Sequence, residues 1–193
     1  MKNIAITNVH LDLGAGRRGT DMGSSAIHVA QLIPRLKKLG HNIEMISSIG
    51  SESSEALEVG AENARFLHDI LSVCQQLKHT VAQNIAMNHF PLVLGGDHSQ
   101  AIGTISGIAS EFKKQQKKLG VIWVDAHTDM NTPETSPSGN IHGMPLATML
   151  GRGHPDLLAL NGDSPSLLPE NVAIIGARDI DPTEAKIVRE IGV

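Results

Sequence analysis

The sequence lacks the features of a disulfide-stabilised or membrane-spanning protein. Cys74 is its only cysteine, so no disulfide can form within the chain, as is common in a reducing compartment. No apolar run reaches the length that spans a membrane. The first residues also lack the apolar core of a signal peptide. We therefore expect a cytoplasmic protein with no membrane partner.

Aromatic residues and positive charge are also scarce. The 193 residues include 3 Phe, 1 Trp and 0 Tyr, and the formal net charge is −4. The core must then consist mostly of Ile, Leu, Val and Ala. The one basic cluster, at 113–118, has no aromatic partners and suits the solvated face of a helix end. We expect no nucleic-acid partner, because the chain has no general attraction for one.

What the chain does have is an alternation of apolar strands and amphipathic helices. Strands are predicted at 3–9, 42–49, 91–95, 121–125 and 172–176. Helices are predicted at 27–39, at 55–87, from Ser99, at 145–150 and at 182–191. Pro34 indicates a kink in the first helix or a later start, and a break near His79 in the second is left open. In the helix from Ser99, Gly103 and Gly107 are expected to allow close packing on the sheet. This alternation predicts an α/β protein with a mostly parallel sheet, and residues 1–193 are expected to form a single domain.

Ligand-type side chains follow the strand at 121–125. Asp125, His127 and Asp129 alternate in sequence, so they can project to one side where the strand ends. Carboxylates suit hard divalent cations such as Mn²⁺, and imidazole suits transition metals. On spacing alone, half of a metal site and a solvated, capped strand end are equally good interpretations.

The strand at 91–95 ends in a similar way. Gly95 and Gly96 turn the chain, and Asp97 and His98 follow. Sites in open α/β sheets assemble at the carboxyl ends of strands, so His98 can converge with the residues at 125–129. Histidines at both strand ends favour ligation over packing. For Asp97 we favour a turn or a supporting hydrogen bond over ligation.

Three segments together resemble the arginase branch of the ureohydrolase family. They are Gly-Gly-Asp-His-Ser at 95–99, Asp-Ala-His-Thr-Asp at 125–129 and Ser-Gly-Asn-Ile-His-Gly at 138–143, in the order and at the spacing of the family. The resemblance implies a three-layer α/β/α fold with a mostly parallel sheet. It also implies a homo-oligomeric enzyme that converts a small molecule, L-arginine, to L-ornithine and urea. The nucleophile would be a hydroxide activated by two Mn²⁺ ions.

The resemblance further implies roles for individual residues. The metal ligands would be His98, Asp125, His127 and Asp129, with Asp125 shared between the two ions. The catalytic residues would be His142 and Asp129. The substrate-binding residues would be Asn131, Ser136, Ser138, Asn140, Asp181 and Glu184.

Among these, His142 resembles a proton shuttle to the departing amine, a task that suits a pKa near neutrality. It could instead only stabilise its loop. Asp181 resembles the acid that receives the substrate's α-ammonium, and it could also cap the helix that begins at Pro182. Trp123, in the middle of a strand, is expected to pack in the core.

Two other interpretations of the sequence are weaker. Gly14, Gly16 and Gly19 match the dinucleotide-binding pattern G-x-G-x-x-G, but two adjacent arginines interrupt it. We prefer a flexible active-site loop there, as the resemblance implies. A serine hydrolase is discarded because neither Ser99 nor Ser138 lies in a G-x-S-x-G turn.

The chain also departs from the family. Chains of the family continue beyond Val193 with two aspartates that complete the metal shells, and their sheet order, 2-1-3-8-7-4-5-6, places the last two strands between the third and the fourth. We therefore expect a truncated arginase lacking the C-terminal strands. Its third and fourth strands pair directly, or another chain fills the gap, or the chain is a fragment. An agmatinase-type ureohydrolase and a non-catalytic metal-binding remnant stay open as alternatives, although the segment 138–140 favours arginine.

Overall fold

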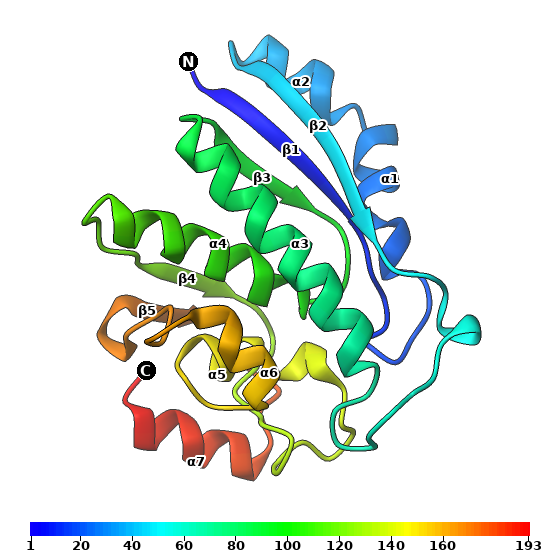
Figure 1. The fold of residues 1–193 in the computed structure, drawn as a ribbon, viewed down its shortest axis with the longest axis vertical. Coiled ribbons are helices and arrows are strands. Elements are labelled where there is room, and N and C mark those ends of the chain that lie inside the picture. The colour runs from blue at the N-terminus through cyan, green and yellow to red at the C-terminus, as the bar shows by residue number, and fades with distance from the viewer.

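Five parallel strands form two separate sheets in the computed structural model, which describes residues 1–193 (Figure 1). The first sheet has the order β2-β1-β3 and the second pairs β4 with β5. The strands are β1 (Asn3–His10), β2 (Asn42–Gly50), β3 (Phe90–Leu94), β4 (Val121–Val124) and β5 (Val172–Ile175). All five lie within one to two residues of the predicted ranges.

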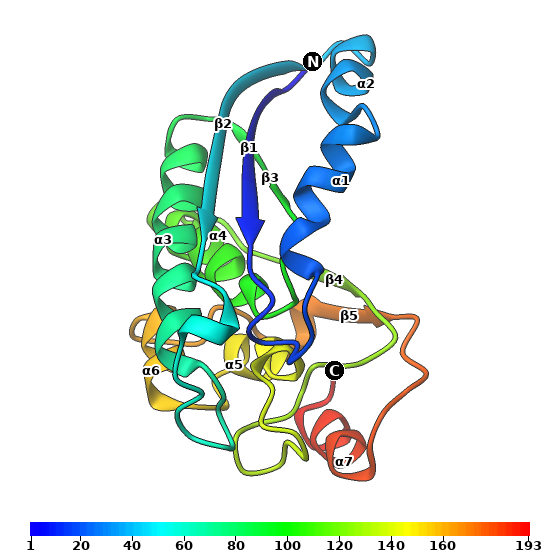
Figure 2. The ribbon, with the colours of Figure 1, turned by 90° about the vertical axis from the view of Figure 1, so that its right-hand side faces the viewer.

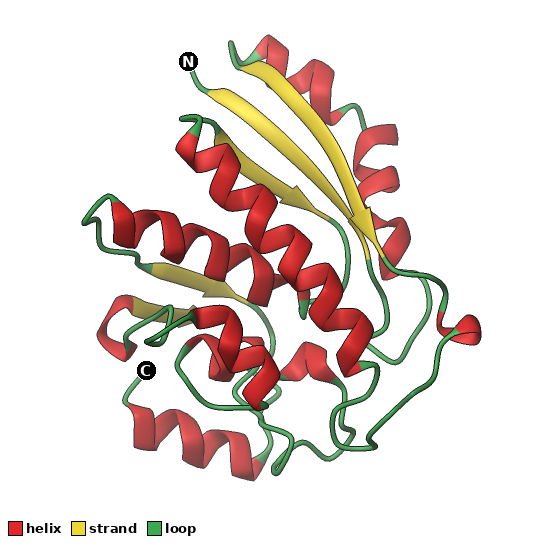
Figure 3. Cartoon of the chain, viewed as in Figure 1, coloured by secondary structure: helices red, strands yellow, loops and turns green.

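Helices cover both faces of the first sheet, which confirms the α/β class. Figure 2 shows α1 (Gly23–Val29) and α2 (Leu32–Lys38) on one face, and α3 (Leu67–Ala86) and α4 (Gln100–Lys114) on the other. Around the second sheet lie α5 (Pro145–Met149), α6 (Pro155–Leu158) and α7 (Pro182–Ile191). Figure 3 shows that long loops connect the elements at the carboxyl ends of the strands. None of the helices is long and apolar enough to span a membrane.

The main hydrophobic core continues from one sheet to the other. It contains Val9 of β1, Ile70 of α3, Ile102 of α4 and Trp123 of β4, all of them buried. Because α4 contacts both α3 and α5, it joins the two parts of the molecule where the strands do not. This apolar packing, rather than a continuous hydrogen-bonded ladder, holds the two sheets together.

Strands β3 and β4 do not pair with each other. Of the possibilities left open by the sequence, direct pairing of the third and fourth strands is therefore not adopted. The apolar side chains of Ile122, Val124 and Ile175 are exposed on the second sheet. His98 consequently follows a strand of one sheet, and Asp125 follows a strand of the other.

Two helix predictions were wrong in part. The helix predicted at 27–39 is two helices, separated at Gln31, whose φ is +66°. Pro34 lies in the first turn of α2, where its missing N–H costs nothing. The helix predicted at 55–87 begins only at Leu67 and runs unbroken to Ala86, because the chain before it is held in turns, with φ of +70° at Gly60.

The two glycines of α4 also have a different role from the predicted one. A Cβ added to Gly103 would lie 2.4 Å from the carbonyl oxygen of Cys74, and one added to Gly107 would lie 2.6 Å from that of Lys78. Both carbonyls belong to α3. The glycines therefore allow close packing between two helices, rather than between a helix and the sheet.

Candidate metal centre and adjoining cavity

A glycine turn after β3 brings Asp97 and His98 to the start of α4. Gly95 and Gly96 both have φ of +79°, a left-handed conformation that favours glycine. A Cβ on Gly95 would lie 2.6 Å from the backbone nitrogen of Ser24. The turn can therefore be this tight only with glycine, and it directs His98 towards the end of β4.

The segment after β4 is held by hydrogen bonds to its own side chains and to α5. Oδ1 of Asp125 accepts a hydrogen bond from the His127 amide (3.0 Å), which closes a local turn. Asp129 has φ of +52°, an uncommon conformation for a residue other than glycine. Its carbonyl accepts from the amides of Leu146 (3.1 Å) and Ala147 (3.2 Å) at the start of α5. These bonds hold the Asp129 carboxylate in place despite the strained backbone.

Three donor groups from the two sheets meet at one point. Nδ1 of His98 lies 2.8 Å from Oδ2 of Asp125 and 2.7 Å from Oδ2 of Asp129. The donor atoms of all three residues lie within 4.8 Å of one another. A single Nδ1 proton cannot point at both oxygens, and Oδ2 of Asp129 is buried without a hydrogen-bond partner. The arrangement leaves a buried carboxylate oxygen unsatisfied, which is costly unless a cation binds there.

The spacing of these donors suits a small divalent cation. At metal–ligand bonds of about 2.1 Å, adjacent donors of an octahedral site lie about 3 Å apart, close to the separations around His98 Nδ1. One imidazole and two carboxylates also match the donor preferences of a transition metal. His98, Asp125 and Asp129 therefore fit a metal ion by both geometry and chemistry.

His127 lies beside this group and contacts a different oxygen. Its Nδ1 is 3.4 Å from Oδ1 of Asp125, and its Nε2 is 3.5 Å from Oδ2 of Asp179. Asp179 is brought there by its amide, which donates to the carbonyl of Ala126 (3.0 Å). The two oxygens of Asp125 thus face two different histidines. Asp179 is not among the metal ligands that the family resemblance implied.

The charges of this group reinforce one another. Burial lowers the pKa of His98, but the carboxylates of Asp129 and Asp125 outweigh it, so the pKa lies above its usual value. Burial raises the pKa of Asp125, but the His127 amide and the charge of His98 outweigh it, so that pKa is lowered. Asp125 is therefore held in its ionised form, the form that binds a cation.

A polar cavity of about 300 Å³ adjoins these donors, and no hydrophobic residue lines it. It brings together nine of the residues singled out from the sequence: His127, Asp129, Asn131, Ser136, Ser138, Asn140, His142, Asp181 and Glu184. These residues come from the loop after β4 and from the start of α7. A cavity lined mostly by charged and polar residues suits a small, charged ligand rather than an apolar one.

Two acids in this cavity are engaged in hydrogen bonds that hold its wall. Asp181 caps α7, since its Oδ1 accepts from the amide of Glu184 (2.8 Å), and its Oδ2 accepts from Nδ2 of Asn131 (2.9 Å). Burial raises the pKa of Asp181, but these hydrogen bonds outweigh it and the pKa is lowered. Glu184 is buried, and its Oε1 accepts from the amide of Met130 (3.0 Å). The bond from Met130 fixes α7 to the segment after Asp129, a contact that no sequence pattern indicated.

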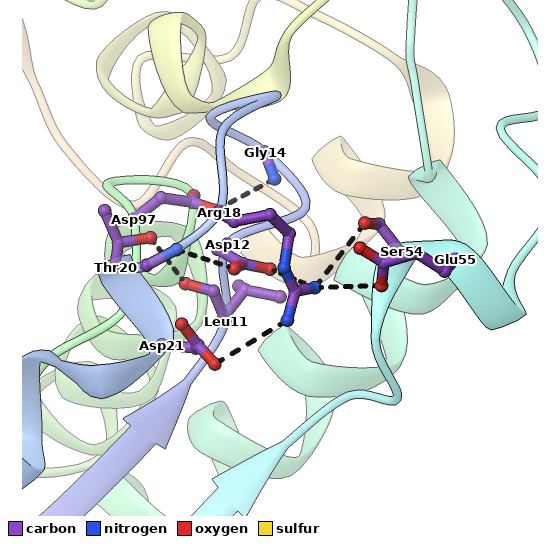
Figure 4. Close-up of polar contacts among 10 residues, drawn as sticks. Leu11, Asp12, Gly14, Arg18, Thr20, Asp21, Ser54, Glu55 and Asp97 are labelled. Carbon is purple, nitrogen blue, oxygen red and sulfur yellow. Dashed lines mark hydrogen bonds and ion pairs between the residues drawn. The ribbon is translucent and has the colours of Figure 1, made fainter.

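The glycine-rich loop after β1 packs against the site. A Cβ added to Gly14 would lie 2.6 Å from Oδ1 of Asp97, and one added to Gly16 would lie 2.9 Å from Nδ2 of Asn140. Figure 4 shows that Arg18 anchors the far end of this loop, 3.4 Å from Asp12. The glycines therefore serve close contact with the segments around 97 and 140, which argues against a nucleotide site in the loop.

Comparison with known proteins identifies relatives along the whole chain. The family model of the arginase family matches residues 2–193. The arginase of Bacillus caldovelox is 50% identical over 194 residues, which cover 100% of this chain and 64% of that protein. Its solved structure, at 49% identity, superposes with a TM-score of 0.93 over 100% of this chain and 64% of that chain. The arginase of Entamoeba histolytica in complex with L-ornithine has a TM-score of 0.84 at 32% identity and covers 98% of this chain and 64% of that one.

Proposed function

This chain belongs to the arginase family, and on that premise we propose that the protein hydrolyses L-arginine to L-ornithine and urea with Mn²⁺ as its cofactor. The chain spans 64% of the length of its Bacillus caldovelox relative. The observation that carries it is the polar cavity, which adjoins the group His98, Asp125 and Asp129.

His98, Asp125 and Asp129 would hold one ion, and His127 with the second oxygen of Asp125 would hold the other. Bound Mn²⁺ would lower the pKa of a water molecule, so that a hydroxide is available near neutral pH. The lowered pKa of Asp125 supports its role between the two ions, because an ionised carboxylate can give one oxygen to each.

Residues of the cavity wall would orient the amino-acid end of the substrate. The hydroxyl oxygens of Ser136 and Ser138 accept hydrogen bonds from the amides of Gly139 (3.0 Å) and Asn140 (3.2 Å). Their own protons remain available to a substrate carboxylate. Asn131 and Asn140 would add amide groups.

Asp181 and Glu184 would face the α-ammonium of the substrate. The lowered pKa of Asp181 keeps it negative. His142 would carry a proton to the departing amine of ornithine, since an imidazole exchanges protons near neutral pH.

Urea release, measured beside metal content, tests this function. With added Mn²⁺ we expect urea from L-arginine, and much less from agmatine, which lacks the α-carboxylate. Asp129→Asn should abolish both urea release and ion binding. A chain that binds an ion without releasing urea would support a non-catalytic metal-binding remnant. No urea, together with less than one ion per chain, would overturn the proposal.

We also propose, from the family resemblance, that the protein is a homo-oligomer in the cytoplasm. Light scattering should give a mass that is a multiple of the monomer mass. A monomer at micromolar concentration would contradict this assembly.

A further inference from the structure

Asp97 connects the turn that carries His98 with the glycine-rich loop. It is buried, and both of its carboxylate oxygens accept hydrogen bonds. Oδ1 accepts from the amide (2.9 Å) and the hydroxyl (2.5 Å) of Ser99, and Oδ2 accepts from the amide of Gly14 (2.8 Å, Figure 4). Its own amide donates to the carbonyl of Leu11 (2.8 Å). Asp97 therefore binds the loop at two points, through its side chain and through its backbone.

The loop passes this constraint on to the segment that carries His142. The amide of Gly14 binds Asp97, and the carbonyl of the same residue accepts from the amide of His142 (3.2 Å). Next along the loop, the carbonyl of Ala15 accepts from Nδ2 of Asn140 (3.3 Å). Asp97 and His142 are 45 residues apart in sequence, yet one residue separates them along this path. The side chain of His142 lies in the polar cavity.

The other end of the loop is held separately. Oδ2 of Asp12 accepts from the amide of Gly19 (3.0 Å), and Arg18 contacts Asp12 (3.4 Å) and Glu55 (3.6 Å), as Figure 4 shows. Asp12 is buried to nearly the same degree as Asp97, 5% against 4% exposed. The amide of Gly14 donates to Asp97 and not to Asp12. The loop thus has two buried aspartate anchors, of which only Asp97 leads to His142.

We propose that Asp97 is a positioning residue, which holds the backbone of His142 through Gly14 and so places the imidazole relative to the metal-binding group. The importance of this placement rests on the proposed function, in which His142 transfers a proton. The placement itself depends only on the hydrogen bonds described. The path thus connects one buried carboxylate to the segment that carries His142.

Amide hydrogen exchange tests the placement without any need for activity. Asp97→Asn has nearly the same size, but its side chain cannot accept hydrogen bonds on both sides, so the bond from Gly14 or those from Ser99 must be lost. We expect the His142 amide to exchange at least about tenfold faster, because its acceptor is no longer held. Asp12→Asn is the matched control and should leave that exchange rate unchanged.

A second variant disturbs the path from the loop side. In Gly14→Ala the added Cβ would lie 2.6 Å from Asp97 Oδ1 and 2.8 Å from Ser99 Oγ, so the loop and the Asp97 carboxylate must move apart, which disturbs the bond between them. It should speed exchange at His142 as Asp97→Asn does. The proposal is overturned if Asp97→Asn and Asp12→Asn change the exchange rate of the His142 amide equally. It is also overturned if Asp97→Asn or Gly14→Ala leaves that rate unchanged.

Kinetics separate positioning from a purely structural role. In the active protein, Asp97→Asn should lower kcat on the order of tenfold to a hundredfold, as small misplacements of catalytic groups do. The KM for arginine and the Mn²⁺ content should stay unchanged. A loss of Mn²⁺ that parallels the loss of kcat would refute the positioning role. If the unaltered protein releases no urea, the proposed function fails, whereas the exchange measurement still decides the placement.

Discussion

The indole ring of Trp123 stacks on the imidazole ring of His98, with ring centroids 4.3 Å apart and planes inclined by 21°. Trp123 belongs to β4, and His98 follows β3, so the stack connects two sheets that share no backbone hydrogen bonds. Trp123 is almost completely buried and cannot readily move. The stack therefore fixes the plane of the imidazole whose Nδ1 faces Asp125 and Asp129.

Replacing Trp123 should weaken both the fold and the metal site. We expect Trp123→Ala to lower the free energy of unfolding by about 3–5 kcal/mol, as for other buried aromatics. Affinity for Mn²⁺ should fall on the order of tenfold or more, because the ligand loses its support. Trp123→Phe keeps an aromatic face and should lose less affinity. Denaturant unfolding and calorimetric titration with Mn²⁺ give the two quantities.

Leu77→Ala, in the core of α3, is the control for stability alone. Unchanged affinity for Mn²⁺ in Trp123→Ala would contradict the role of the stack.

Gly139 should tolerate no side chain. Its φ is +69°, and an added Cβ would lie 1.8 Å from the carbonyl oxygen of Glu62. Gly162 has a similar φ of +77° with nothing within 4 Å, so Gly162→Ala should cost only the left-handed conformation, roughly 1–2 kcal/mol. Gly139→Ala must in addition displace backbone next to the polar cavity. Its free energy of unfolding should be clearly lower than that of Gly162→Ala, and equal values for the two variants would show that the loop adapts freely.

Mn²⁺ should stabilise the fold through the group His98, Asp125 and Asp129. A ligand that binds only the folded state at a concentration of 100 Kd raises the free energy of unfolding by about 2.7 kcal/mol. Thermal unfolding should therefore shift upwards with Mn²⁺ and return with a chelator. Asp129→Asn should lose the shift, whereas Asp163→Asn, an exposed position in another loop, should keep it. A shift that survives in Asp129→Asn would place the ion elsewhere.

The contribution of Asp181 to stability should depend on pH. Hydrogen bonds from Asn131 and Glu184 outweigh burial and lower its folded pKa below the usual value of 3.8. A lowered folded pKa means that the contribution is present above 3.8 and is lost as pH falls through the folded value. Asp181→Ala should therefore cost about 1 kcal/mol near neutral pH, as for other helix caps, and less in acid. The free energies of unfolding of the unaltered protein and of Asp181→Ala, measured from acid to neutral pH, give this difference. A difference that stays constant with pH would contradict the prediction.

Patterns along the chain predicted the strands and the meeting of His98 with Asp125 and Asp129. Strand periodicity is a local property of the sequence, and the rule that sites assemble at the carboxyl ends of strands depends only on topology. Both can therefore be applied without coordinates. The residues around the cavity, such as Ser138 and Asp181, came from the family resemblance, and the fold brings them together. Their individual roles remain predictions.

Contacts between distant segments could not be predicted in this way. Trp123 was expected only to pack, because nothing in its own strand indicates that His98 supplies the facing ring. The partners of Gly103 and Gly107 belong to a helix some 30 residues earlier, and the sequence did not distinguish this helix from the sheet. The start of α3 at Leu67 was missed because apolar residues before it, such as Leu57, pack from a loop instead.

The lack of hydrogen bonds between β3 and β4 has a mechanical consequence for the ion. His98 follows β3 of one sheet, whereas Asp125 and Asp129 follow β4 of the other. Any shift of one sheet relative to the other would change the distances between the three donor groups. A coordinated cation would act as a cross-link that resists this shift. An ion bound by these three donors would therefore connect the two sheets at a place where no backbone hydrogen bond does.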